Sequence, residues 1–477
     1  MATTDTTLAQ IVASIGFAIG QMIDKLPSDN GRLALDGSKR SVLVGLASLS
    51  AGAIAASCTA SYGRSLNIAR QVDEVTFGPT DAFVMPAAAG SGDGSSWSNA
   101  ATLASLPSLL ASPSVGRVNI RADAGDYAID SALNSILLTA GGTPDKFKIV
   151  RGVDIDGNAM KAKLIGIRQT AAHTGSTNKT HRGYDVFKIQ ADYLEFRDLF
   201  LSRNAMNFDI SGTRQGIRVI DCDGSYYRFF VSNIVADTGS GQGTLTDFAI
   251  SGGFHDYMDV ATVSLKNASN GSISGVIGRG HGESFPSSNQ TPHGIRLASL
   301  SHDVTIEDCD FEEIYCRYAS SGYFNGDAYV DETECYNIIW RRNRAAKCTD
   351  GGFDLKSTNV TLEDCISDGN KLNYRFWGSG VVRRCRSISP VLRGGPNPEA
   401  HVSLPNSTPG ATARYDIIDF EVSDDPSDTS PILRASGSQP STLRITGGNV
   451  TKSGSTGAPR APLLVTTGAG AVTLEFV

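Results

Sequence analysis

The sequence predicts an all-β fold, a parallel β-helix in which coils of short strands stack along one axis. A pattern of two strand-like segments recurs about every 21 to 25 residues within 324–379, with no helical segment between the repeats. The chain has 51 Gly, 40% hydrophobic and 19% charged residues, a composition that suits strands and turns better than helices. Within each segment, polar and apolar residues alternate, as in a strand that buries one face.

The repeat is formed by two series of segments. The first series is 326–331, 352–356 and 373–377, and the second is 336–340, 359–363 and 380–383. Because each coil buries its apolar residues against the neighbouring coils, a chain of 477 residues need not divide into separate globular domains.

Residues 1–26 are predicted to form a helix that ends at Pro27. Its apolar residues are spaced alternately four and three positions apart, as in a coiled-coil seam: Leu8, Val12, Ile15, Ile19, Met22 and Leu26. The helix either packs against its own domain or forms an oligomerisation stalk.

Residues 37–58 have two interpretations. They resemble a twin-basic export signal that ends at a lipobox-like Cys58, which requires translation to start downstream, for example at Met22. They also resemble the N-terminal stalks of phage tail-fibre and spike proteins, and we favour this second interpretation. We therefore expect four regions: 1–60 as a helical stalk or anchor, 61–80 as a connector, 81–390 as the β-helix, and 391–477 as terminal coils, a cap or an oligomerisation tip.

Charge and cysteine positions exclude some classes of function. The net charge is −7 and no run of Lys or Arg stands out, so a nucleic-acid partner is not expected. Of the eight Cys, four fall in one column of the aligned repeats, together with Asn343: Cys222, Cys309, Cys365 and Cys385. One column of a solenoid is one interior ladder, so we expect buried thiols, rather than disulfides or zinc ligands, in a chain that folds in a reducing cytosol.

The run Gly90-Ser-Gly-Asp-Gly-Ser-Ser-Trp97 resembles the entry into the pectate-lyase-like superfamily. With the repeats, the resemblance covers about 81–477. It implies a right-handed parallel β-helix with a short capping helix over the first coil. Three stretches are too long for coil turns and are expected to protrude as loops that build a binding face: 167–184, 226–260 and 278–292.

Alternation along the strands predicts two outward columns of polar and aromatic side chains. The first is Arg296, Tyr329, Asp354 and Arg375, and the second is Asp331, Lys356 and Trp377. From them we assign catalytic roles to Lys356, Arg375, Asp354 and Asp331, and substrate-binding roles to Trp377, Tyr329, Arg296 and Asp327. The alternative is an exposed charge ladder without chemistry, in which each pair contributes under about 1 kcal/mol. Trp377 favours a site, because an exposed indole beside cations suits the stacking of a sugar ring.

Two chemistries fit these columns. Elimination from a uronic-acid glycan needs a cation or Ca²⁺ to neutralise the uronate, and a base for the C5 proton. The resemblance implies Lys356 or Arg375 as that base, while Asp327, Asp331 and Asp354 are candidate oxygen ligands for Ca²⁺. No cofactor is otherwise expected.

Hydrolysis needs two carboxylates instead, one of them a protonated acid. Asp354 paired with Asp331 or with Asp327 meets this need across neighbouring coils. Asp350 is expected in a turn, and His293 beside an insertion.

These features predict a spike of a phage or phage-like particle, located on the virion surface. It would be a homotrimer attached to other virion proteins through its N-terminal segment. The spike would recognise, and as an enzyme depolymerise, a bacterial surface polysaccharide. The alternatives are an exported or lipid-anchored lyase or epimerase of the periplasm or exterior, and a glycan-binding adhesin without activity.

Overall fold

The computed structural model describes residues 77–168, 183–234, 243–282, 291–316, 324–395, 398–406, 413–423, 430–450, 464–468 and 470–477. The chain divides into two units, Met1–Val72 and Asp73–Val477, and the described residues belong to the second. The helices predicted over 1–26 and 37–58 lie outside the described residues. The described part of the chain contains no helix long and apolar enough to cross a membrane.

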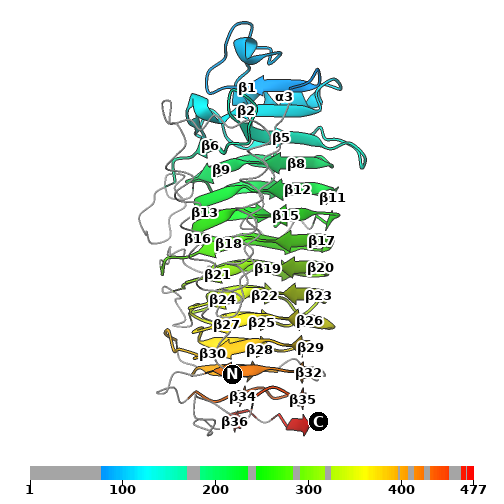
Figure 1. Cartoon of the computed structure of the whole chain (residues 1–477), viewed down its shortest axis with the longest axis vertical. Coiled ribbons are helices and arrows are strands. Elements are labelled where there is room, and N and C mark those ends of the chain that lie inside the picture. Colours follow the sequence, from blue (N-terminus) through cyan, green and yellow to red (C-terminus); the bar gives the residue numbers. More distant parts are fainter. Residues whose placement is uncertain are drawn as a thin grey trace, which may run out of the picture. The chain divides into compact units, whose positions relative to one another are not determined.

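The second unit is a parallel β-helix, which confirms the predicted fold class: every pairing between its strands is parallel (Figure 1). Each coil passes through three faces. The first face is a ladder of β1 (Asp81–Val84), β2 (Arg117–Arg121), β5 (Lys148–Val153), β8 (Leu194–Arg197), β12 (Ile217–Ile220), β15 (Ala249–Ser251), β17 (Ala268–Ser274), β20 (His302–Glu307), β23 (Tyr336–Arg341), β26 (Val360–Glu363), β29 (Ser379–Arg383), β32 (Ala413–Ile418), β35 (Ser441–Thr446) and β37 (Val472–Phe476), with the short β11 (Arg214–Gln215) and β14 (Leu245–Thr246) beside it.

The second and third faces form one continuous sheet, because β13 (Asp223–Ser232) and β16 (Phe254–Lys266) run through the corner between them. The second face also contains β3 (Tyr127–Ala128), β6 (Ala162–Ile165), β9 (Leu199–Ser202), β18 (Ile277–Arg279), β21 (Asp310–Glu312), β24 (Arg344–Ala346), β27 (Ile366–Asp368), β30 (Arg386–Ile388) and β33 (Glu421–Ser423). The third face also contains β4 (Ile136–Leu138), β7 (Phe187–Ile189), β10 (Met206–Ile210), β19 (His293–Ala298), β22 (Asp327–Asp331), β25 (Gly351–Leu355), β28 (Leu372–Phe376), β31 (Ala400–Leu404), β34 (Leu433–Ala435) and β36 (Leu464–Thr466).

A short helical segment lies at the N-terminal end of the stack (Figure 1). It comprises η1 (Trp97–Asn99), η2 (Leu103–Ser105) and α3 (Leu106–Ala111), and η3 (Ala122–Ala124) follows β2. Leu106 and Leu110 are buried, and α3 contacts β2 and β4. This helix therefore closes the apolar end of the first coils, as the resemblance implied.

The first and second faces meet at a sharp corner made by a single residue with a positive φ. In five coils this residue is Asp308, Arg342, Asp364, Arg384 and Asp419, with φ between 50° and 56°. The four from Asp308 to Arg384 also alternate in charge from coil to coil, and Arg342 bonds to Asp308 at 2.7 Å. These pairs offset part of the cost of the left-handed backbone at each corner.

The interior is a continuous apolar core with aromatic stacks along the axis. Tyr329 stacks on Phe353 and Phe353 on Tyr374, with ring centroids 4.8 and 5.2 Å apart. The described cysteines are free and buried, as expected. Cys309 and Asn343 lie in one ladder, since the Asn343 amide accepts from the Cys309 N–H at 2.9 Å and donates to the preceding coil.

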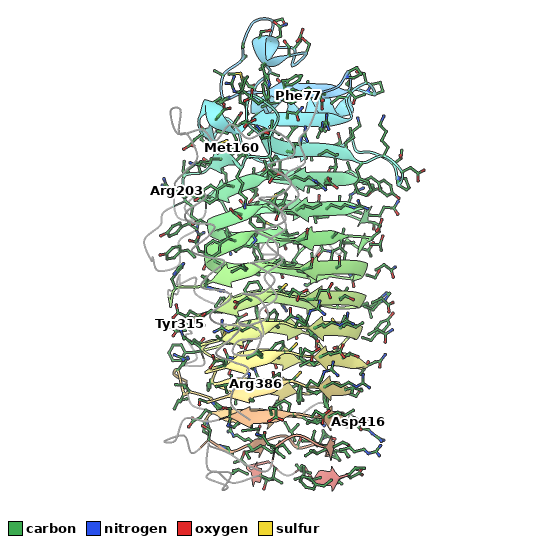
Figure 2. All side chains as sticks on the ribbon, viewed as in Figure 1. Phe77, Met160, Arg203, Tyr315, Arg386 and Asp416 are labelled. Atoms are coloured by element: carbon green, nitrogen blue, oxygen red, sulfur yellow. The ribbon has the colours of Figure 1, made fainter. Side chains whose placement is uncertain are left out.

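One expectation about loops is wrong. Residues 226–260 do not form one protruding loop, because strands β13, β14, β15 and β16 occupy most of the described residues in this range. Side chains project from every coil, and Arg203 and Tyr315 lie on one side of the stack while Asp416 lies on the other (Figure 2).

Candidate functional site: a buried carboxylate cluster

The candidate site lies on the third face, on the coils of β22, β25 and β28. The register joins Arg296 to Val330, Val330 to Asp354 and Asp354 to Arg375. The structure therefore brings Arg296, Asp354 and Arg375 into one column, although Tyr329 is not part of it. The side chain that replaces it in the column is Val330.

The predictions that Tyr329 and Asp331 face outward are wrong by one residue of alternation. Tyr329 pairs with Phe353 and is fully buried, and its hydroxyl donates to the Arg344 carbonyl at 3.0 Å. Asp331 pairs with Leu355 and is also fully buried. Burying the tyrosine ring in the aromatic stack decides the direction of Tyr329 and Asp331. Asp327, at the start of the strand, lies beside Asp350 and Asp354 instead.

Asp331 is occupied by structural hydrogen bonds. One of its carboxylate oxygens accepts from the backbone N–H groups of Lys356 and Ser357, at 2.7 and 2.8 Å, and the other accepts from the Trp340 indole at 3.2 Å. Burial raises the pKa of Asp331 to about 6, against the opposing effect of these bonds. Its place in the interior supports a role in holding the turn after β25.

Three carboxylates converge just outside the corner between the second and third faces: Asp327 at the start of β22, Asp350 immediately before β25, and Asp354 within β25. Their side chains are held by shared partners. Arg375 lies 2.8 Å from Asp350 and 3.5 Å from Asp354. With its nitrogen turned toward the acids, the Asn325 amide donates to Asp327 at 2.9 Å and to Asp350 at 3.2 Å. We call Asp327, Asp350 and Asp354 the carboxylate cluster.

Asp354 is the ionised member of the cluster. It accepts from the Lys356 ammonium at 2.6 Å and from the Trp377 indole at 2.7 Å. Burial opposes its ionisation, but Arg375 and Lys356 outweigh burial and lower the pKa of Asp354 to about 2.

Asp327 is the member of the cluster whose pKa is raised. It is 1% exposed, and burial followed by repulsion from Asp350 and Asp354 raises its pKa well above the ordinary value. One of its oxygens accepts from the Gly351 N–H at 2.5 Å, and the other lies 3.9 Å from the imidazole of His293. Burial and the nearby Arg296 hold the pKa of His293 well below its ordinary value, so this imidazole is neutral.

Neighbouring acids of the cluster share partners. Oxygens of Asp327 and Asp350 both lie within hydrogen-bond distance of the one Asn325 amide, and one nitrogen of Arg375 lies close to both Asp350 and Asp354. Asp350 therefore lies between the other two acids in this chain of contacts. An acid with a raised pKa beside an ionised carboxylate is the combination that hydrolysis by two carboxyls requires.

More exposed side chains form a rim next to the cluster. Lys356, whose side chain is 20% exposed, lies 3.4 Å from Glu332, and Glu332 bonds to Arg296 at 2.9 Å. The guanidinium of Arg375 lies 5.3 Å from the ring centre of Trp377. The structure thus brings together six of the eight predicted site residues, all except Tyr329 and Asp331.

The sequence prediction missed Asn325 and Lys371, and it placed Asp350 in an ordinary turn. The Lys371 ammonium lies 3.9 Å from Asp350, and its side chain is fully buried. All three residues lie just before strands of the third face, where alternation gives no direction. Asp350 directly precedes β25 and Lys371 directly precedes β28, and these two strands pair with Gly351 opposite Leu372. This equivalence of position is the signal in the sequence that could have brought the two residues together.

The calcium prediction finds no support in the geometry. Among the described ranges there is no group of three or more His, Cys, Asp or Glu side chains that would hold a metal ion. Asp331 in particular turns into the core, away from Asp327 and Asp354.

No model of a known protein family matches the chain, and no curated protein matches it in sequence. Several solved structures are similar in fold. The Dettilon tailspike protein is 12% identical with a TM-score of 0.47, over 82% of this chain and 68% of its own. The catalytic domain of a GH87 alpha-1,3-glucanase is 10% identical with a TM-score of 0.47, over 83% and 70%. The pectate lyase Pel9A is 11% identical with a TM-score of 0.37, over 82% and 80%. At these identities the likeness concerns the parallel β-helix fold alone.

Proposed function

We propose that this protein hydrolyses glycosidic bonds of a bacterial surface polysaccharide at the carboxylate cluster. The observation that carries the proposal is the convergence of three buried carboxylates on shared partners, with Arg375 between Asp350 and Asp354 and the Lys356 and Trp377 side chains bonded to Asp354. In this arrangement burial and the neighbouring acids raise the pKa of Asp327, while Arg375 and Lys356 lower the pKa of Asp354. Asp327 donates its proton to the glycosidic oxygen as the bond to the anomeric carbon breaks. Asp354 faces the positive charge that develops on the sugar. Water then adds its hydroxyl to the anomeric carbon, which becomes the new reducing end, and its remaining proton restores Asp327.

Elimination is the less favoured chemistry, for a reason internal to the site. A lyase base must be deprotonated. Burial lowers the pKa of Lys356, but Asp354 and Glu332 outweigh burial and raise that pKa, which favours the charged ammonium. Arg375 is tied to Asp350 at 2.8 Å. Both predicted bases therefore act as positive partners of the acids rather than as proton acceptors.

The rim supplies a binding surface for the glycan. Trp377 is fixed through its indole nitrogen by Asp354, and a sugar ring stacked on the indole would lie next to the acids. Arg296 and Glu332, with side chains 32% and 31% exposed, present hydrogen-bonding groups one or two coils away. Sugar hydroxyls are suitable partners for such groups.

The test is digestion of a panel of capsular polysaccharides, alginates and other surface glycans, followed by two readouts: new reducing ends, and the ultraviolet absorbance of unsaturated uronates. Hydrolysis gives the first signal without the second. Asp327→Asn and Asp354→Asn should each lower the rate about 10²–10⁴-fold, whereas Asp364→Asn, at an exposed corner of the first face, should leave it unchanged. An ultraviolet absorbance that rises with digestion would show that the reaction is elimination and not hydrolysis. Binding of a glycan without either product would show that the protein is an adhesin without activity.

For the biological setting, we infer a homotrimeric virion spike whose N-terminal segment attaches to other virion proteins. The support is the coiled-coil spacing over 1–26. The alternative is an enzyme exported to the periplasm or exterior and anchored through Cys58. Intact mass of the mature protein separates them: residues 1–58 retained favour the spike, and cleavage before Cys58 favours export. Light scattering then tests the trimer.

A further inference from the structure

One carboxylate of the rim, Glu332, lies between two cations. Glu332, Lys356 and Trp377 each follow directly after a strand of the third face, on successive coils. The backbone N–H of each of them donates to a carbonyl of the preceding coil. The three side chains therefore form one outward column, in which Glu332 comes one coil before Lys356.

Glu332 contacts both cations at once, through different oxygens. Its Oε1 accepts from Nη2 and Nε of Arg296, at 2.9 and 3.2 Å. Its Oε2 lies 3.4 Å from the Lys356 ammonium, and the same ammonium lies 2.6 Å from Asp354. Two cations thus face two carboxylates, and the charges on this part of the surface balance.

These ion pairs lie where a glycan on the rim would meet them. The side chains of Arg296, Glu332 and Lys356 are all partly exposed, so solvent reaches each of them. A carboxylate on a sugar placed here would be repelled by Glu332, and it would have to separate Glu332 from a cation before binding that cation. Hydroxyl groups of an uncharged sugar can bond to the outer atoms of the same pairs without breaking them.

The same contacts bear on elimination. A uronate that undergoes elimination needs positive charge beside its carboxylate, but Arg296 and Lys356 already neutralise Glu332 and Asp354. Arg375, the cation beside Trp377, is likewise paired with Asp350 at 2.8 Å. The arrangement that disfavours elimination therefore also disfavours an acidic substrate.

We propose that Glu332 is a specificity-determining residue, which makes the rim suited to uncharged sugars and excludes acidic ones. The inference rests on the proposed function, because it names the substrate class of the same site. An ion pair that served the fold alone would leave the choice between glycans unchanged when it is broken. This difference separates the two roles by experiment.

The first test uses two polymers that differ in charge alone: an uncharged polysaccharide that the wild type digests, and its carboxymethylated derivative. We expect the wild type to cleave the derivative with a kcat/KM about 10-fold lower, and Glu332→Gln to reduce this ratio to about 3-fold or less. Glutamine no longer repels a carboxylate, and it leaves Arg296 without its partner. The matched control is Glu334→Gln, which removes the same charge from an exposed position two residues away and should keep the wild-type ratio.

Two results would overturn the inference. One is a wild type that digests acidic glycans of the panel but no uncharged one. The other is a ratio that is the same in Glu332→Gln and in the wild type.

The second test does not depend on catalysis. Affinity electrophoresis measures binding directly, in gels that contain alginate, a uronic-acid polymer, or dextran, an uncharged one. Alginate should retard Glu332→Gln more than the wild type and more than Glu334→Gln, with a difference that shrinks at high salt. Equal retardation of all three proteins by alginate would refute the role of Glu332.

The two tests also separate this inference from the proposed function. If the wild type digests no glycan on the panel, the proposed function fails, and the alginate gels still decide whether Glu332 sets the charge preference of the rim. If the wild type digests the uncharged polymer and its carboxymethylated derivative equally well, hydrolysis stands and only this inference fails.

Discussion

Replacing Asp327 by asparagine should lower activity about 10²–10⁴-fold and yet stabilise the folded protein at neutral pH. The carboxyl is 1% exposed, and burial followed by repulsion from Asp350 and Asp354 raises its pKa. In the unfolded chain the same group ionises near pH 3.9. As the pH rises above that value, the unfolded state loses its proton while the folded state keeps it. The wild type therefore loses stability until the pH passes the folded pKa.

Each pKa unit by which the folded value exceeds the unfolded value lowers the unfolding free energy by about 1.4 kcal/mol. For a β-helix of about 400 residues, with an unfolding entropy of about 2.1 cal/mol/K per residue, this free energy corresponds to about 2 °C in Tm. The asparagine side chain of the Asp327→Asn variant would resemble the protonated acid in shape, and it carries no titrating group. The difference in Tm between Asp327→Asn and the wild type should thus be small near pH 4 and grow toward pH 8.

Scanning calorimetry of both proteins from pH 4 to pH 8 measures this difference. Asp364→Asn is the control, because that carboxylate is exposed and bonded to Arg384 at 2.8 Å; its difference from the wild type should not grow with pH. A pH-independent difference for Asp327→Asn would refute the assignment of Asp327 as the protonated acid. So would a wild type that gains stability relative to the variant as the pH rises.

Three further predictions concern other groups. Asp331→Ala leaves three buried N–H donors without their acceptor, so it should lower the unfolding free energy by about 3–6 kcal/mol, measured by denaturant titration; a loss under about 1 kcal/mol would contradict the structural role of Asp331. Arg342→Gln removes exposed pairs with Glu307 and Asp308, so it should cost under about 1 kcal/mol, and less in high salt. The seven described cysteines should resist a thiol reagent until the protein unfolds, since burial raises the pKa of thiols such as Cys309, to about 12; rapid labelling of any of the seven would contradict their burial.

The repeat period and the alternation of residues were enough to predict the fold. They also predicted most of one functional column, because Arg296, Asp354 and Arg375 are single polar residues between apolar neighbours in their strands. Such a pattern has one solution: the apolar residues turn inward. The same argument placed Lys356 and Trp377 on the outer side, where they do lie.

The same argument failed for the segment 327–331, because either set of alternating residues in it could be buried. Reading Ala328 and Val330 as buried leaves two acids outside, which is the conventional choice. The structure takes the opposite phase at Tyr329 and Asp331, since the buried Tyr329 ring contributes more contact than a small side chain and three N–H groups satisfy Asp331. Asp327 lies with Asp350 and Asp354, as predicted for an outward residue. Competing burial energies decide such a strand, and they depend on partners in other coils that the local pattern does not contain.

The outward column of the third face gives a reason to regard the carboxylate cluster as functional. On the two coils just before the cluster this column carries Ser232 and Ser264, and on the coil just after it Ser403, while Lys188, Asp209 and Arg434 occupy it farther along the stack. Neighbouring coils therefore stack without a charge at this place. Burying several acids and cations together costs more than small or apolar residues would, because each charge leaves water. The fold nevertheless concentrates buried acids on adjacent coils and drives the pKa values of Asp327 and Asp354 in opposite directions. A costly arrangement that raises the pKa of one acid and lowers the pKa of another within one cluster is typical of a catalytic centre, whereas a stabilising ion pair would lower the pKa values of all its acids together.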